Sequence, residues 1–364
     1  MSDLVIIEYQ DLIAPQGSSE HDEARMTMMK KNIEKAFGPD GFGVLAIRGV
    51  PGFVQAKMEC LPQAYALAHL PLEQLQKLED PVSLYNAGWS HGKEMLKPNQ
   101  PDLAKASFYF NPITDLPGTE EDRTRFPISY PSNKWPTESL PTLEPSLKRL
   151  GCLMKDVAVQ VARYIDAYAQ QHCPIGSYPT DMLYSTLKDS DKVKGRLLYY
   201  YPLSESQPDT SVDSWIGFHN DSGYLTALAG DIYMDPQGNL LSQSPNPEAG
   251  LYVEDRNQQV VHVNIPSDCM AIQMGECTQI VTGGSVVATP HCVKGAPGLV
   301  RISLACFIDV PPSTPIAAPP GCSEASILAK ESTLVPPLSQ RWHNGITFGD
   351  FLQQTFQLYY EWKD

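Results

Sequence analysis

Residues 299–308 have the sequence Leu-Val-Arg-Ile-Ser-Leu-Ala-Cys-Phe-Ile, which is the clearest β-strand in the chain. Side chains two apart in a strand share a face, so Arg301, Ser303 and Phe307 are predicted to point to one side of a sheet. A buried arginine is costly unless it is paired, and its planar fork pairs best with a carboxylate. That carboxylate belongs either to an Asp or Glu of the protein or to a bound ligand.

Three potential metal ligands precede this strand. His291 lies ten residues before Arg301, and His219 and Asp221 lie further upstream, each beside apolar, strand-like segments. Two imidazoles and one carboxylate on one face of an ion leave the opposite coordination positions open, which is the ligand set of non-haem Fe(II) oxygenases. The sequence therefore predicts an iron site at these three residues. With such a site nearby, a ligand carboxylate is the favoured partner of Arg301.

The His-x-Asp pair is informative only through its order and context. In a chain with eight His and 42 acidic residues, a His-x-Asp/Glu pair is expected about once by chance. A second match, His21-x-Glu23, does occur, in a polar run that predicts a solvated helix start. We therefore assign no metal to it.

The order of these residues resembles that of the isopenicillin-N-synthase-like 2-oxoglutarate/Fe(II) dioxygenases. Further segments carry the same resemblance, so that it covers most of the chain, from about residue 5 to residue 360. These segments are Asp40 to Pro51, Tyr199-Tyr200-Tyr201-Pro202, Gly250-Leu251-Tyr252-Val253 and Gln279 to Gly284.

This resemblance implies roles for the individual site residues. The three metal ligands would hold Fe(II), and Arg301 and Ser303 would bind the distal carboxylate of 2-oxoglutarate, helped by Tyr201, the tyrosine directly before the proline. Many relatives carry Asn at the position of Tyr199, so the resemblance does not imply the cosubstrate contact of that Asn for this chain. Phe307 occupies a position that faces the organic substrate in relatives, and ordinary core packing is an equal alternative.

The implied activity is oxidation, most simply hydroxylation, of a small organic molecule by O2, with release of succinate and CO2. Desaturation, ring closure and demethylation use the same cofactors, and the sequence does not identify the substrate. Three alternatives remain: an iron oxidase of the same fold that does not use 2-oxoglutarate, a zinc hydrolase with the same ligands, and a catalytically silent binding protein. No general base at a recognisable spacing supports the hydrolase, and a complete set of ligands argues against a silent protein.

Apolar periodicity and turn residues predict an α+β chain in three parts. Residues 1–180 are expected to form a mixed, largely helical region, residues 181–315 a strand-rich catalytic core, and residues 316–364 a tail and helix packed on that core. The resemblance implies that the core is a double-stranded β-helix, a jelly-roll or cupin-like barrel flanked by helices. Iron would lie in its mouth, where ligands commonly bind in barrels.

Several local expectations follow from residue spacing. A helix is predicted over residues 62–78, and a long helix is predicted by the apolar face that runs from Leu147 to Tyr168. Residues 80–145, rich in Pro, Asn, Gly and Ser, predict an irregular excursion. The gap between the second and third metal ligands is longer than expected for the family. Its turn-rich stretch, residues 231–249, predicts a surface excursion either at the rim of the pocket or on the far side of the barrel.

Composition indicates a globular protein with a sizeable core, since 42 % of the 364 residues are hydrophobic. The net charge of −15 disfavours binding to nucleic acid or to anionic membranes. No apolar run approaches the length of a membrane span, and Met1-Ser2-Asp3-Leu4 is not a charged-then-apolar leader. We expect a cytoplasmic monomer that acts on a small molecule. Cys292, beside His291, is predicted to be a free buried thiol on the opposite face of its strand.

Overall fold

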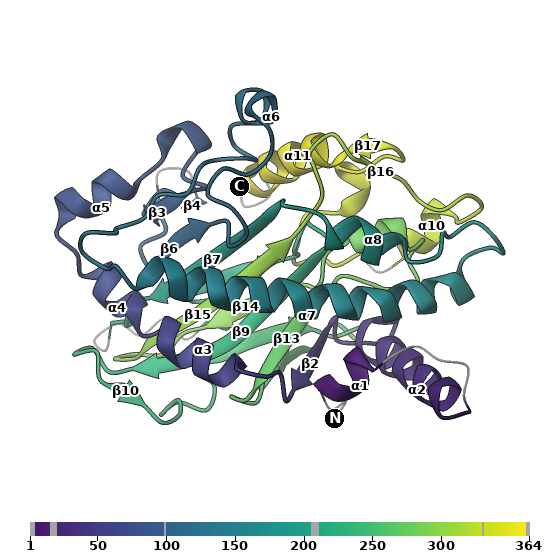
Figure 1. The fold of residues 1–364 in the computed structure, drawn as a ribbon, viewed down its shortest axis with the longest axis horizontal. Coiled ribbons are helices and arrows are strands. Elements are labelled where there is room, and N and C mark those ends of the chain that lie inside the picture. Colours follow the sequence, from purple (N-terminus) through teal and green to yellow (C-terminus); the bar gives the residue numbers. More distant parts are fainter. Residues whose placement is uncertain (1–3, 15–19, 98–99, 205–210, 330, 362–364) are drawn as a thin grey trace.

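The computed structural model describes residues 4–14, 20–97, 100–204, 211–329 and 331–361 (Figure 1). In these residues the main feature is a mixed sheet of nine strands, in the spatial order β1 (Val5–Glu8), β2 (Val44–Arg48), β13 (Cys269–Met274), β9 (Leu225–Met234), β15 (Val300–Ile308), β7 (Val193–Tyr200), β6 (Lys105–Phe110) and β3 (Gly88–His91), with β10 (Leu240–Leu241) paired to β9. A smaller sheet has the order β12 (Val260–His262), β11 (Gly250–Glu254), β14 (His291–Lys294) and β8 (Ile216–His219).

Helices and short strand pairs surround the two sheets. The strand pairs are β4 (Met95–Lys97) with β5 (Gln100–Pro101) and β16 (Pro315–Ile316) with β17 (Ile346–Thr347). The helices are α1 (Tyr9–Ile13), α2 (Glu20–Phe37), α3 (Phe53–Cys60), α4 (Gln63–Ala68), α5 (Leu72–Leu78), α6 (Glu120–Arg125), α7 (Leu143–His172), α8 (Met182–Lys188), α9 (Glu276–Val281), α10 (Glu324–Ile327) and α11 (Phe348–Glu361). No helix in the described residues combines the length and the apolar character needed to cross a lipid bilayer.

The two faces of the large sheet have different partners. Helix α7 crosses one face (Figure 1), and the apolar stripe predicted from Leu147 to Tyr168 is buried against it, so the predicted helix is confirmed. Side chains alternate along β7. Leu197 belongs to the core under α7, whereas Leu198 joins a second apolar cluster that includes Val293 of the small sheet. The small sheet therefore packs on the face opposite α7.

The helix predicted over residues 62–78 is wrong in one respect, because two helices, α4 and α5, occupy this stretch. Pro71 precedes α5 with an extended ψ of 141°. A proline has no backbone N–H to donate and disfavours the helical conformation in the residue before it. The chain therefore breaks its helix at residues 69–71.

The expectation of an irregular excursion over residues 80–145 is also wrong in part. β3 and β6 pair antiparallel and extend the large sheet beyond β7, with Trp89 opposite Phe108. All six residues of β6 are buried, so its sequence lacks the alternation of polar and apolar residues that marks a half-exposed strand. Both aromatic rings are buried in this part of the core, where they anchor the segment.

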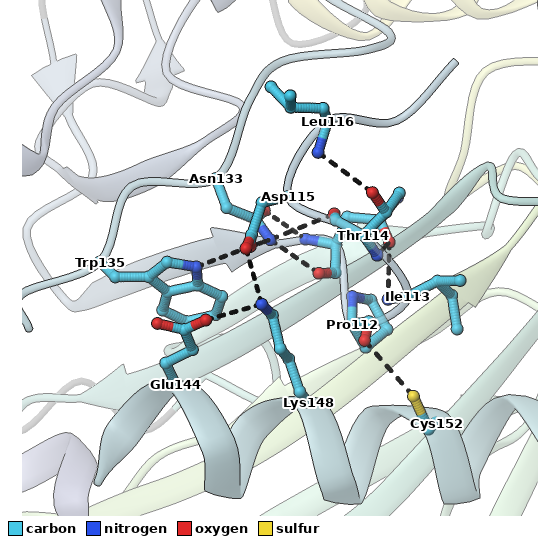
Figure 2. Close-up of polar contacts among 11 residues, drawn as sticks. Pro112, Ile113, Thr114, Asp115, Leu116, Asn133, Trp135, Glu144, Lys148 and Cys152 are labelled. Carbon is cyan, nitrogen blue, oxygen red and sulfur yellow. Dashed lines mark hydrogen bonds and ion pairs between the residues drawn. The ribbon is translucent and has the colours of Figure 1, made fainter. Parts of the chain in front are cut away.

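The loop after β6 is fixed to α7 by polar contacts (Figure 2). Asp115 accepts hydrogen bonds from the Trp135 indole and from Lys148 of α7, both at 2.8 Å. The close approach depends on Gly151 of α7, because a Cβ at that position would lie 2.5 Å from Cβ of Pro112. The segment is therefore an integral part of the fold, not a linker to a separate unit.

Candidate metal centre and adjoining cavity

Strands β8 and β14 bring the two predicted histidine ligands together. His219 is the register partner of His291, and their ring centroids are 4.2 Å apart. Asp221 lies two residues beyond the end of β8, and its Oδ1 is 3.9 Å from Nε2 of His291. The potential ligand atoms of the three residues all lie within 4.8 Å of one another. In the part of the chain that the structure describes, this is the one group of three or more His, Cys, Asp or Glu side chains arranged to hold a metal.

The two histidine side chains have the hydrogen bonding that metal ligands need. The Nδ1–H of His219 donates to the Gly217 carbonyl oxygen at 2.9 Å, and that of His291 donates to the Thr289 carbonyl oxygen at 3.1 Å. A carbonyl only accepts, so the proton of each ring is held on Nδ1, and Nε2 is the nitrogen through which a neutral imidazole would bind a metal. Burial, followed by the neighbouring His291, lowers the pKa of His219 well below its ordinary value, which keeps this imidazole neutral.

The carboxylate of Asp221 supports the same interpretation. The side chain is buried, and its Oδ2 has no hydrogen-bond partner. A buried carboxylate oxygen without a partner is costly, and a cation offsets that cost. The two imidazoles and this carboxylate therefore fit a divalent metal such as iron.

A buried ion pair holds the loop between the ligands in place. Asn220 donates from Nδ2 to Glu276 at 2.9 Å, and its backbone N–H donates to the Tyr359 hydroxyl of α11 at 2.9 Å. Glu276 in turn is paired with Arg341, and both side chains are almost fully buried. The C-terminal segment thus supports the metal loop from behind, a role that the sequence did not predict.

We expect Arg341→Met to lower the free energy of unfolding by about 3–5 kcal/mol, because breaking a buried pair leaves the other charge uncompensated. Urea denaturation of the metal-free protein measures this. The matched control is Arg149→Met, since the pair between Arg149 and Glu59 is exposed and such pairs contribute about 1 kcal/mol or less. Equal losses for the two variants would show that the Glu276 pair has no special role in stability.

A cavity of about 910 Å³ adjoins the three ligands and lies between the two sheets. Arg301, Ser303 and Phe307 of β15 all line it, as their alternation predicted. Tyr201 does not line it. Its ring packs on His91, with ring centroids 4.9 Å apart.

Tyr200, rather than Tyr201, faces the cavity beside Arg301. Tyr200 is the register partner of Arg301 and lines the cavity, with its ring centroid 4.6 Å from the guanidinium carbon. Along β7, Arg196, Leu198 and Tyr200 line the cavity, whereas Tyr199 belongs to the core under α7 and Tyr201 follows the end of the strand. Arg301 and Tyr200 therefore form the pair on this wall.

Arg301 also has a partner within the protein. Its Nη2 lies 2.6 Å from Oδ1 of Asp231 on β9, which is the alternative that the sequence left open. Burial opposes the charge on Arg301, but Asp231 together with Tyr200 and Tyr233 raises its pKa above the ordinary value. The pairing register of β9 and β15 shifts beside Gly230, whose φ is +73°. This bulge turns Asp231 into the cavity, and Gly230 within the strand is the local sequence signal that could have indicated it.

The excursion over residues 231–249 lies at the cavity, not on the side of the sheets remote from it. Leu240, Leu241, residues 242–244 and residues 246–247 of this stretch line the cavity, together with Val54 and Met58 of α3. Leu240 and Val54 are about half exposed. The excursion and α3 thus contribute both apolar and polar side chains to the lining of the cavity.

Two further residues lie near the ligands, and only one of them, Arg196, lines the cavity. Arg196 of β7 lines the cavity, is paired with Glu94 at 2.6 Å, and its charge contributes to the lowered pKa of His219. Cys292 is a free, buried thiol, as predicted, and burial raises its pKa to about 12. Arg196 therefore offers a polar group to a ligand, whereas Cys292 stays protonated at neutral pH.

Solved structures of 2-oxoglutarate/Fe(II) oxygenases have the same fold as this chain. A putative 2OG-Fe(II) oxygenase family protein from Caulobacter crescentus has a TM-score of 0.68 at 21 % identity, with 98 % of this chain and 99 % of that chain covered. A full-length Neurospora crassa protein, solved in complex with alpha-KG (2-oxoglutarate) and thymine, has a TM-score of 0.67 at 17 % identity, with 98 % and 97 % covered. The dioxygenase for auxin oxidation from rice has a TM-score of 0.61 at 16 % identity, with 98 % and 96 % covered.

No protein-family model matches the sequence, and no similar sequence was found among curated proteins. At these levels of identity the structural similarity establishes the fold. The fold expected from the sequence resemblance, that of a 2-oxoglutarate/Fe(II) oxygenase, is thereby confirmed. The isopenicillin-N-synthase-like branch is not singled out.

Proposed function

We propose that this protein is an Fe(II)- and 2-oxoglutarate-dependent dioxygenase that oxidises a small organic molecule. One observation carries the proposal. His219, Asp221 and His291 form a compact ligand set at a cavity that is also lined by a buried Arg301 and Ser303. A metal ligand set and a carboxylate-binding fork in one cavity match the two ends of a keto acid.

The residues of the chain would have distinct tasks in this reaction. The three ligands would hold Fe(II), and Arg301, with Ser303 and Tyr200, would fix the distal carboxylate of 2-oxoglutarate. When bound, iron and 2-oxoglutarate supply the activation of O2 and the oxidation of the substrate, with release of succinate and CO2. The protein's own contribution is to orient these groups, to neutralise charge and to exclude water.

We also propose that the two sheets form a double-stranded β-helix, with residues 181–315 as catalytic core and residues 1–180 and 316–364 packed around it. The substrate would lie between Arg196 and Phe307, at the end of β15 remote from Arg301. This arrangement suits a small molecule with a flat apolar part and a hydrogen-bond acceptor. The Neurospora crassa protein, which binds thymine in its solved complex, is similar in fold.

A second candidate is an iron oxidase of the same fold that does not use 2-oxoglutarate. The ion pair between Arg301 and Asp231 favours it, because the guanidinium already has a carboxylate partner. The two candidates differ in whether turnover depends on the keto acid.

Succinate formation separates them. We expect the protein with Fe(II), O2 and 2-oxoglutarate to form succinate slowly even without substrate, and His291→Ala to form none. A small-molecule panel that includes thymine would then be screened for stimulation of this rate. If the wild-type protein binds iron but forms no succinate with any member of the panel, the iron oxidase is the better description.

A further inference from the structure

The inference concerns the carboxylate of Asp231, which occupies the fork of Arg301. Asp231 approaches Nη2 of Arg301 at 2.6 Å, and the Tyr233 hydroxyl donates to the same carboxylate at 3.1 Å. The fork is not saturated, however. Nε of Arg301 is buried and has no hydrogen-bond partner, and Nη1 makes a long contact, 3.5 Å, to Ser303. Donors of Arg301 thus remain available to an added carboxylate.

A second buried cation lies beside this pair. Lys57 of α3 is 2 % exposed and lines the same cavity. Its Nζ lies against the bulge next to Asp231, because a Cβ on Gly230 would be 3.1 Å away. Among the described residues it donates to the Ser267 carbonyl oxygen at 3.3 Å and forms no ion pair. Burial lowers the pKa of Lys57, and the charge of Asp231 opposes this effect.

The net charge at this end of the cavity is therefore positive, so that one additional anion would neutralise it. Arg301 is paired with Asp231, and the charge of the same carboxylate also acts on Lys57. One carboxylate thus faces two cations. Asp268, the other carboxylate that influences Lys57, is paired with Arg48 at 3.4 Å. One more carboxylate would balance the two cations, provided that Asp231 turns from one cation to the other.

We propose that Asp231 is an exchangeable counter-ion: it neutralises Arg301 in the free protein and turns to Lys57 when the distal carboxylate of a dicarboxylic keto acid binds Arg301. Asp231 and Lys57 then determine which charge the site accepts at that end of the cosubstrate. The inference rests on the proposed function. It adds two specificity-determining residues that contact neither the metal ligands nor the substrate end of the cavity.

The test is equilibrium binding to the full chain loaded with Mn(II), measured by calorimetry so that no turnover is needed. The two ligands are 2-oxoglutarate and 2-oxopentanoate, which lacks the distal carboxylate. We expect Asp231→Asn to tighten 2-oxoglutarate binding about tenfold, because close buried charge pairs contribute at least this much. Binding of 2-oxopentanoate should not tighten.

Lys57→Met should weaken 2-oxoglutarate binding about tenfold, because Asp231 then has no second partner. In the double variant the Lys57 substitution should have little effect, which is a coupling that independent structural defects would not produce. The control is Glu248→Gln, an acid of the same excursion whose side chain is 67 % exposed. It should leave both affinities unchanged.

Asp231→Ser, a smaller neutral replacement, carries the same expectation as Asp231→Asn in case one variant does not fold. Unchanged or weaker 2-oxoglutarate binding in the folded Asp231 variants would overturn the inference and would mean that Asp231 positions Arg301. Absence of 2-oxoglutarate binding from the wild type and from every variant, with Mn(II) still bound, would overturn the proposed function as well.

Discussion

His219→Ala is expected to lose iron binding almost completely. The substitution removes one of three donors and leaves Asp221 buried beside a single imidazole. Loss of a residue that merely supports a metal ligand costs about 10- to 100-fold in affinity, so loss of a ligand should cost more. Metal analysis after anaerobic loading with Fe(II) and gel filtration measures the iron retained.

The chain offers a matched control for this experiment. His21→Ala removes the histidine of the other His-x-Glu/Asp pair, which lies exposed in the first turn of α2. The control should retain the iron content of the wild type. Equal iron in the two variants would place the metal elsewhere or exclude it.

Arg301→Ala is expected to weaken 2-oxoglutarate binding severely while leaving iron binding intact. Truncating one partner of a buried charge pair costs about 2–5 kcal/mol, or roughly thirty- to four-thousand-fold in affinity. The site lies away from the ligands, since Arg301 pairs with Tyr200 and Tyr233 across the large sheet, whereas the ligands come from β8, β14 and the loop after β8.

Arg301→Lys should recover only part of the loss. Lysine offers a point charge in place of the planar fork, so it cannot bind a carboxylate through two parallel hydrogen bonds. Titration of each variant with 2-oxoglutarate, with iron content measured in parallel, gives the two quantities. A variant that loses iron and 2-oxoglutarate together would instead indicate a general disruption of the cavity.

The sequence predicted the residues whose position depends on strand alternation alone. Arg301, Ser303 and Phe307 line the cavity because they are spaced by even numbers along one regular strand. The same reasoning placed Cys292 and His291 on opposite faces of β14. Local periodicity is enough where a strand has no irregularity.

The failures lie where the pairing is irregular or distant. Asp231 reaches Arg301 through a bulge at Gly230, and Tyr200 rather than Tyr201 faces the cavity because Tyr200 is the residue paired with Arg301 across the sheet. Lys57 comes from a helix far away in the sequence. Such contacts depend on tertiary packing, which a single sequence does not encode in a readable local pattern.

The most direct test of the account is an anaerobic absorption titration of the full-length protein with Fe(II) and 2-oxoglutarate. Direct chelation of iron by the keto acid gives a weak visible metal-to-ligand charge-transfer band. We predict that the band appears only when both are added, is absent from His219→Ala, and requires a much higher 2-oxoglutarate concentration in Arg301→Ala. A wild-type protein that binds Fe(II) stoichiometrically but shows no band at saturating 2-oxoglutarate would contradict the central claim.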